Sequence, residues 1–211
     1  MNPYIQVDAS SPIQLPKKIV ICGCPYSGKT SLIRRFLCNS FVEEYSKTSG
    51  IDVIPSSIFF GEVIIHYNIW DFPNWEVNNN LVNRYMSKTD AALIVFDNGI
   101  ESYQSCLKWI DILQQIYPKT RIFAIQNKYD LIKKYDINWI NQCKNELKQK
   151  EVIYYQVSSK SGYNVKNCFN EILKELFDIP TTTPLIDPLE TQEVPEKKYY
   201  CKNWFCSYQQ L

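Results

Sequence analysis

The stretch from Ile19 to Leu32, IVICGCPYSGKTSL, constrains this chain more than any other. Its first four residues are mostly apolar and predict a short buried strand, and residues 29–38 predict a helix. Between strand and helix, residues 23–30 satisfy the pattern G-x-x-x-x-G-K-[ST]. A strand, this glycine-rich turn and a helix, in that order, form the context in which the pattern binds phosphate.

The chemistry of this turn follows from its geometry. A glycine-rich turn that runs into a helix directs several backbone N–H groups at one point, where the helix dipole also favours negative charge. Lys29 would add a cation at the β- and γ-phosphates, and Thr30 would offer its hydroxyl to Mg²⁺, which prefers hard oxygen ligands. The candidate residues of this phosphate site are Gly23, Tyr26, Ser27, Gly28, Lys29, Thr30 and Ser31.

Strands and helices alternate along the chain. We predict strands at 17–22, 51–60, 62–70, 91–96, 121–126 and 151–157. We predict helices at 29–38, 81–88, 101–116, 138–150 and 164–177, the last with Asn164 as its N-cap. The pattern predicts an α/β fold with a mostly parallel, six-stranded sheet and helices on both faces. Such sheets bind ligands at the carboxyl ends of their strands.

The length of 211 residues suits one domain with tails. We expect an irregular lead-in at 1–16, the domain at 17–179, and a flexible Pro/Thr linker with an aromatic tail at 180–211. The tail contains Cys201 and Cys206, but Tyr208 and Gln210-Leu211 occupy the positions of a prenylated cysteine. Prenylation is therefore disfavoured, and membrane association stays open.

Composition narrows the partners and the compartment. Lys and Arg total 23 against 22 Asp and Glu, so no basic field predicts nucleic-acid binding. No apolar run is long enough to span a bilayer, and residues 1–16 do not resemble a secretory signal. The eight scattered cysteines are typical of reduced thiols. We expect a cytoplasmic protein.

A second pattern, Asn127-Lys128-Tyr129-Asp130, follows the strand at 121–126. A carboxylate at Asp130 can accept two hydrogen bonds from the ring N–H and the exocyclic amine of guanine, whereas adenine presents no such pair of donors. Four such residues alone also fit an ordinary Asn/Asp turn. After a phosphate-site lysine and a buried strand, they indicate a site that selects guanine.

Two further groups follow strands. Asp71 directly follows the strand predicted at 62–70, where its carboxylate is suited to hold Mg²⁺ through water. The loop Ser158-Ser159-Lys160 follows the last strand and could support the base with a main-chain N–H. The candidate nucleotide ligands beyond the phosphate turn therefore include Asn127, Lys128, Asp130, Ser158, Ser159 and Lys160.

Together these residues resemble the Ras superfamily of small GTPases, from Lys17 to Asp178. The resemblance implies a small G domain of the P-loop NTPase fold, with GTP or GDP and Mg²⁺ as cofactors. Residues 39–48 resemble the first switch of the family. By that resemblance Phe41 would lie against the guanine, Tyr45 would cover the phosphates, and Thr48 would bind Mg²⁺ and sense the γ-phosphate. The implied metal ligands are Thr30, Thr48 and Asp71.

Two segments are similar to Rab and Rab-like members, namely Thr48-Ser49-Gly50-Ile51-Asp52 and the helix from Glu101 to Trp109. Rab-like branches of intraflagellar transport share the motif of the first segment, residues 48–52. The resemblance implies a switch in vesicle or intraflagellar trafficking. Such a protein would be cytoplasmic, bound peripherally to membranes or part of a ciliary complex. Its partners would be effectors or complex subunits that bind residues 41–54 and 71–86.

The second switch departs from the family. Where the family has D-x-x-G-Q-E, residues 71–76 read DFPNWE. Asn74 keeps the backbone N–H that meets the γ-phosphate but adds a Cβ. Trp75 replaces the glutamine that orients water, and an indole has no carbonyl for that task. We therefore assign no catalytic residue and predict slow hydrolysis.

Two functions stay open on these residues. The protein could be a nucleotide-dependent switch, or a pseudo-GTPase that serves as a structural subunit, with Trp75 as a partner-binding aromatic residue. An ATP-using enzyme is disfavoured by Asn127 and Asp130.

Overall fold

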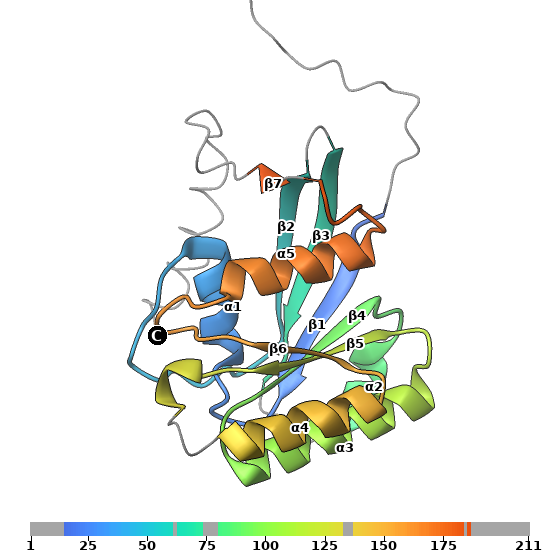
Figure 1. Cartoon of the computed structure of the whole chain (residues 1–211). Helices are drawn as coiled ribbons and strands as arrows, with labels where there is room; N and C mark the ends of the chain where they lie inside the picture. Colours follow the sequence, from blue (N-terminus) through green and yellow to red (C-terminus); the bar gives the residue numbers. More distant parts are fainter. Residues whose placement is uncertain (1–14, 61–62, 74–79, 133–136, 184, 187–211) are drawn as a thin grey trace, which may run out of the picture.

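The computed structural model of the chain describes residues 15–60, 63–73, 80–132, 137–183 and 185–186 (Figure 1). The strands are β1 (Lys17–Gly23), β2 (Asp52–Phe60), β3 (Val63–Asp71), β4 (Ala91–Phe96), β5 (Arg121–Gln126), β6 (Ile153–Gln156) and β7 (Leu185–Ile186). The helices are α1 (Lys29–Cys38), α2 (Asn80–Met86), α3 (Ile100–Ile116), α4 (Ile137–Gln149) and α5 (Val165–Leu176), with a short 3₁₀ helix, η1 (Tyr129–Leu131). The predicted elements are all present, with boundaries that differ by a few residues at most.

The strands form one sheet in the order β6-β5-β4-β1-β3-β2-β7. β1 pairs in parallel with β3 and β4, and β5 joins β4 to β6 in the same sense. β2 and β3 are consecutive in the chain and pair antiparallel. Helices α1 and α5 cover one face, and α2, α3 and α4 cover the other (Figure 1). The predicted fold class is confirmed.

The short strand β7 was not expected. Its two residues pair antiparallel with Phe59 and Phe60 at the outer edge of β2. It lies within residues 180–211, which we predicted as a linker, and it adds a seventh strand to the six expected. Two residues are too few to carry a period in the sequence, and an edge strand offers unpaired backbone groups to any segment that reaches it.

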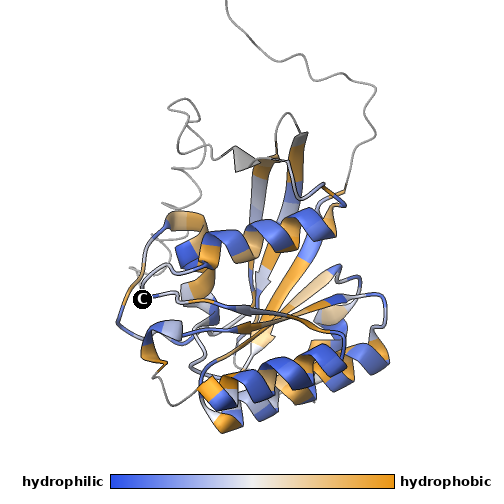
Figure 2. Cartoon of the chain, viewed as in Figure 1, coloured by the Kyte–Doolittle hydropathy of each residue, from blue (hydrophilic) through white to orange (hydrophobic). Residues whose placement is uncertain are grey.

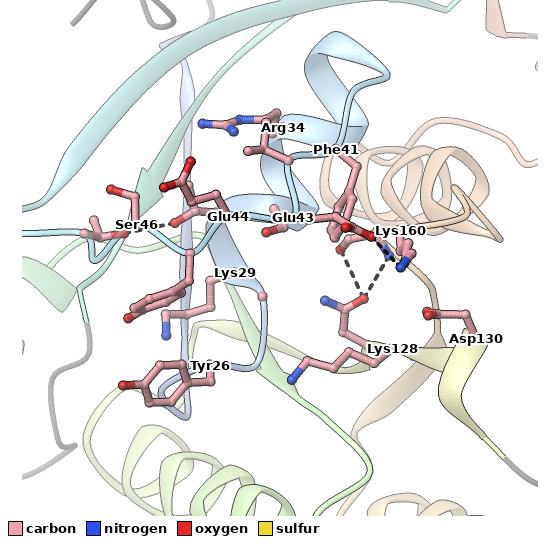
Figure 3. Close-up of a pocket in the computed structure, with 18 of the residues that line it drawn as sticks. Tyr26, Lys29, Arg34, Phe41, Glu43, Glu44, Ser46, Lys128, Asp130 and Lys160 are labelled. Atoms are coloured by element: carbon pink, nitrogen blue, oxygen red, sulfur yellow. Dashed lines mark hydrogen bonds and ion pairs between the residues drawn. The ribbon is translucent and has the colours of Figure 1, made fainter. Parts of the chain in front are cut away.

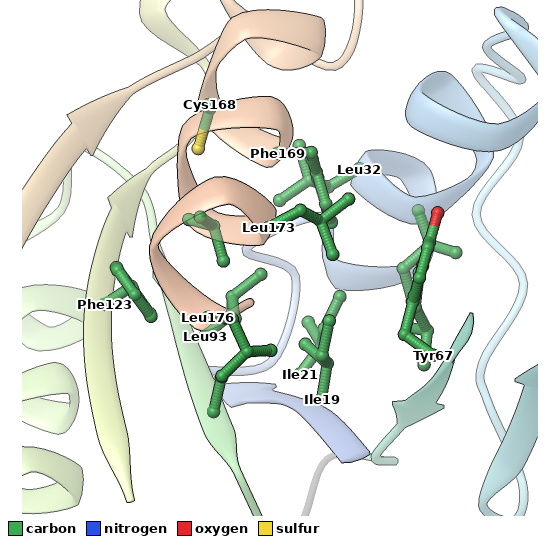
Figure 4. Close-up of a cluster of buried hydrophobic side chains, with 14 of the residues drawn as sticks. Ile19, Ile21, Leu32, Tyr67, Leu93, Phe123, Cys168, Phe169, Leu173 and Leu176 are labelled. Atoms are coloured by element: carbon green, nitrogen blue, oxygen red, sulfur yellow. The ribbon is translucent and has the colours of Figure 1, made fainter. Parts of the chain in front are cut away.

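The core has two halves, one on each face of the sheet. Residues of β1 alternate between them: Ile19 and Ile21 join the half under α1 and α5, and Val20 and Cys22 join the other. Figure 4 shows Ile19 and Ile21 on the side of the sheet that faces Leu173 of α5. In Figure 2 the central strands are mostly apolar, whereas the helices alternate polar and apolar residues. The apolar faces of the helices thus hold the sheet that positions the loops.

Asn164 is the N-cap residue of α5, as predicted, but it does not cap the helix through its side chain. It occupies the cap position, but its φ of 56° is left-handed and its side chain makes no capping bond. Its amide instead donates to the backbone oxygen of Gln156 at 2.9 Å. The side chain therefore fastens the loop before α5 to the end of β6.

Among the described residues, the cysteines agree with the predicted thiols except at Cys38. The free thiols among the described residues are Cys22, Cys24, Cys106, Cys143 and Cys168. Burial raises the pKa of Cys22 to about 12, so this thiol is inert at neutral pH. Cys38 is disulfide-bonded, and the prediction of a reduced thiol is wrong there. Spacing in the sequence does not show which cysteines a fold brings within bonding distance.

Some predictions concern residues that the structure does not describe. These are the lead-in up to residue 14, Asn74 and Trp75 of the second switch, and the tail with Cys201 and Cys206. In the described ranges, no helix combines the length and apolar character needed to cross a bilayer.

Candidate functional site

The phosphate turn, residues 23–30, joins the end of β1 to the start of α1. Gly23 and Gly28 have φ values of 125° and 87°, a backbone conformation that residues with a side chain rarely adopt. A Cβ on Gly23 would lie 2.2 Å from the backbone oxygen of Val95, and one on Gly28 would lie 2.5 Å from the side-chain nitrogen of Asn127. Both glycines are therefore required by the close approach of neighbouring elements as well as by the turn.

Lys29 lies over the turn. Its side chain is buried, and its Nζ donates to the backbone oxygens of Gly23 at 3.2 Å and Cys24 at 3.0 Å. Ser27 closes the same turn, because its hydroxyl donates to the oxygen of Cys24 at 2.8 Å. Burial lowers the pKa of Lys29, and the charge of Asp71 opposes that shift. The amine of Lys29 is therefore held over the phosphate turn by two of the turn's own backbone oxygens.

The three predicted metal ligands lie together. The hydroxyl of Thr30 donates to Asp71 Oδ2 at 2.5 Å and lies 3.0 Å from the hydroxyl of Thr48. Asp71 Oδ1 is buried and has no hydrogen-bond partner among the described residues. Burial raises the pKa of Asp71 to about 7, against the Thr30 bond and the charge of Lys29. Hard oxygens and a buried carboxylate oxygen that lacks a donor fit Mg²⁺.

A cavity of about 280 Å³ connects this cluster to the loop at Asn127–Asp130, which we predicted to select guanine. The predicted residues that line it are Tyr26, Gly28, Lys29, Thr30, Ser31, Phe41, Tyr45, Thr48, Asn127, Lys128, Asp130, Ser159 and Lys160. Gly23, Ser27 and Ser158 are buried next to that lining and support it. The predicted ligand Asn74 lies outside the described residues.

Asn127 holds three loops together at the far end of this cavity. It is 1% exposed, and its Nδ2 donates to the backbone oxygen of Ser27 at 2.9 Å. Its Oδ1 accepts from the backbone N–H of Ser159 at 3.0 Å and from the Ser159 hydroxyl at 3.1 Å. The amide therefore joins the phosphate turn, its own loop and the loop after β6.

The neighbours of Asn127 are also held in place. Asp130 Oδ1 accepts from the hydroxyl of Ser158 at 2.5 Å. Lys128 has a left-handed φ of 62°, and its Nζ pairs with Asp97 Oδ2 at 2.8 Å. The carboxylate that would read guanine therefore sits on a loop fixed from two sides.

Residues 39–48, which resemble a first switch, run across the cavity (Figure 3). At one end Glu43 pairs with Lys160, with 2.7 Å between Oε1 and Nζ. Further along, the ring of Tyr45 lies 4.7 Å from the ring of Tyr26 in the phosphate turn. The hydroxyl of Thr48 also lies 3.0 Å from that of Thr30, so side chains along its length attach this segment to the cavity wall.

Sequence reasoning missed several residues of the site. Those that line the cavity without having been predicted are Arg34, Val42, Glu43, Glu44, Ser46 and Leu131. Val42 to Ser46 lie between predicted ligands, so their place on the switch could have included them. Arg34 and Leu131 carry no pattern that sets them apart.

Arg35 was missed as well, although it organises the base end of the site. Its Nε and Nη2 donate to the backbone oxygens of Ser159 at 2.8 Å and Lys160 at 2.7 Å. Its Nη1 donates to the backbone oxygen of Asn39 at 2.8 Å. One guanidinium thus joins α1, the loop after β6 and the start of the switch, a use of its fork-shaped set of donors.

These features together define a P-loop nucleotide-binding domain: the phosphate turn, the hydroxyl–carboxylate cluster and the Asn-Lys-x-Asp loop lie along one edge of a mostly parallel sheet. Comparison with known families matches residues 18–178 to the Ras family. The match spans most of the chain, and the chain belongs to the Ras family. The expected small GTPase fold and GTP-binding class are confirmed at this level.

Proposed function

We propose that this protein is a guanine-nucleotide switch of Rab or Rab-like type that acts in intracellular trafficking and hydrolyses GTP slowly. One observation carries the switch: Thr48 reaches Thr30, and Thr30 bonds Asp71. The segment at 39–48 therefore ends where a γ-phosphate and its metal would lie. Gain or loss of that phosphate would change how this segment is held, and partners could read the difference.

Thr30, Thr48 and Asp71 would hold Mg²⁺, which would neutralise charge on the nucleotide phosphates. Lys29 and the backbone of the phosphate turn would bind the phosphates, and Asp130 would select the base. The ligand roles of these residues are part of the proposal, and the family membership supports them.

The proposal of slow hydrolysis rests on Trp75, which lies outside the described residues. An indole N–H is a donor only, so it cannot orient an attacking water as a glutamine carbonyl does. The test is to purify the protein without added nucleotide, denature it and identify the released nucleotide by chromatography. Bound GTP is the expected result.

A single-turnover assay with loaded GTP makes this test quantitative, with Trp75→Gln as the matched variant. We expect the substitution to raise the rate. A wild-type rate typical of active family members would refute slow hydrolysis. A protein that is empty and also refuses added GTP would favour the second candidate, a pseudo-GTPase subunit of a complex, for which Trp75 would be a docking residue.

The trafficking role needs a separate test. Immobilised protein loaded with a non-hydrolysable GTP analogue or with GDP is exposed to cell extract, and the bound proteins are compared. A switch should retain effectors in the GTP state through residues 41–54 and 71–86. The same proteins retained in both states would argue for a constitutive subunit.

A further inference from the structure

A chain of side-chain hydrogen bonds runs through the sheet and ends at the guanine-reading loop. Its centre is Gln126, the last residue of β5, whose side chain is fully buried. Gln126 Oε1 accepts from the Tyr154 hydroxyl and, at 3.2 Å, from Gln156 Nε2, both on β6. Gln126 Nε2 donates to Asn98 Oδ1 at 2.9 Å. The chain thus crosses from the edge strand to the loop after β4.

Asn98 connects this chain of hydrogen bonds to the backbone of Lys128. Its Nδ2 donates to the backbone oxygen of Lys128 at 3.1 Å. Lys128 has a left-handed φ of 62°, a conformation that costs free energy unless its surroundings hold it. The turn Tyr129–Leu131, which carries Asp130, begins directly after this peptide.

The two amides at the centre of this network, those of Gln126 and Asn98, both have hydrogen-bond partners. A buried amide is costly when its groups lack partners, and a network with all partners present becomes rigid. The amide of Gln126 has both its oxygen and its nitrogen bonded, and so does the amide of Asn98. A buried amide such as that of Gln126 stabilises a sheet little more than an apolar residue would. Its effect on the orientation of the loop therefore says more about its role.

We propose that Asn98, held by Gln126 and Tyr154, is a positioning residue for guanine selection. It fixes the Lys128 peptide and so the direction in which Asp130 presents its carboxylate. This inference rests on the proposed guanine-nucleotide binding. A carboxylate distinguishes guanine from hypoxanthine by the exocyclic amine, and that hydrogen bond weakens steeply when its angle changes.

The test is the ratio of the affinities for GDP and IDP, measured by fluorescence competition, in the wild type and in Asn98→Ala. The variant should lower the preference for GDP about fivefold or more, as expected for a weakened hydrogen bond. Asp130→Ala provides the reference value for complete loss of the preference for GDP over IDP. The matched control is Gln114→Ala, which removes a similar bond from a side-chain amide to the backbone oxygen of Lys150 on the far side of the domain.

Each outcome decides the inference. Reduced preference in Asn98→Ala with an unchanged ratio in Gln114→Ala supports it. Equal losses of GDP and IDP affinity in Asn98→Ala would show a merely structural role and overturn it. If Asn98→Ala does not fold, the ratio in Tyr154→Phe, which removes one donor to Gln126, decides in the same way. A wild-type protein that binds neither diphosphate would overturn the proposed function itself, and the inference with it.

Discussion

Replacing Asn127 by alanine should make the domain easier to unfold even without nucleotide. We predicted this residue as a nucleotide ligand, but its amide also joins the phosphate turn to the loop after β6. Alanine would leave the backbone oxygen of Ser27 and the backbone N–H of Ser159 without these partners in a buried place. The Ser159 hydroxyl can rotate to another acceptor, so it adds little.

The size of the effect follows from these two backbone groups. A buried group left without a partner costs about 1–3 kcal/mol, so Asn127→Ala should lower the free energy of unfolding by about 2–4 kcal/mol once some water enters the gap. That is a large part of the stability of an ordinary domain. Urea unfolding of the nucleotide-free protein in EDTA, followed by circular dichroism, measures it.

Asn145→Ala is the matched control, because Asn145 is exposed on α4. It should change stability by less than about 0.5 kcal/mol. A similarly small change in Asn127→Ala would refute the argument. Asn127 would then act only through contact with the ligand, and only nucleotide affinity would fall.

Three other changes have expected outcomes that the structure supplies. Tyr26→Ala removes an aromatic contact with Tyr45 that is worth about 0.5–1.5 kcal/mol, so a fluorescent GDP should dissociate about 2- to 10-fold faster, whereas Tyr26→Phe should leave the rate unchanged. Glu43→Gln breaks the pair with Lys160 and should speed the same release at low salt, with no difference from wild type in about 1 M salt. The hydrogen bond and charge of Lys160 lower the pKa of Glu43 below 4.5, so the contact should be complete above that pH and lost as pH falls through the lowered pKa. Gly23→Ala would place a Cβ 2.2 Å from a backbone oxygen of β4 at a φ of 125°, and a fall in melting temperature with loss of nucleotide binding should follow.

Much of the fold could be read from the sequence because its signals are local. The continuous apolar run at 91–96 predicts a strand buried on both faces, and β4 is such a strand. Residues at fixed positions after strands, such as Thr30 and Asp71, could be assigned to one edge of the sheet before their 2.5 Å contact was known. Parallel strands carry their following loops to the same side, so order along the chain was enough.

The contacts between loops could not be predicted in this way. Arg35 and Ser159 are far apart in the sequence, and their bond depends on the conformation of a loop without periodicity. The pair of Glu43 with Lys160 has the same origin. Asn164 shows a related limit, since its residue type fits a cap but its side chain reaches Gln156 instead.

Three of the contacts that hold the switch at 39–48 differ in what controls them, so they can show where nucleotide release begins. The Glu43–Lys160 pair is exposed and responds to salt. The contact of Tyr45 depends on ring packing and should respond to salt very little. The Thr48 hydroxyl lies in the oxygen cluster that fits Mg²⁺, so EDTA should weaken that end. If release opens from the base end, salt and Glu43→Gln will accelerate it while Mg²⁺ is present. If release opens from the phosphate end, EDTA will accelerate it and salt will add little.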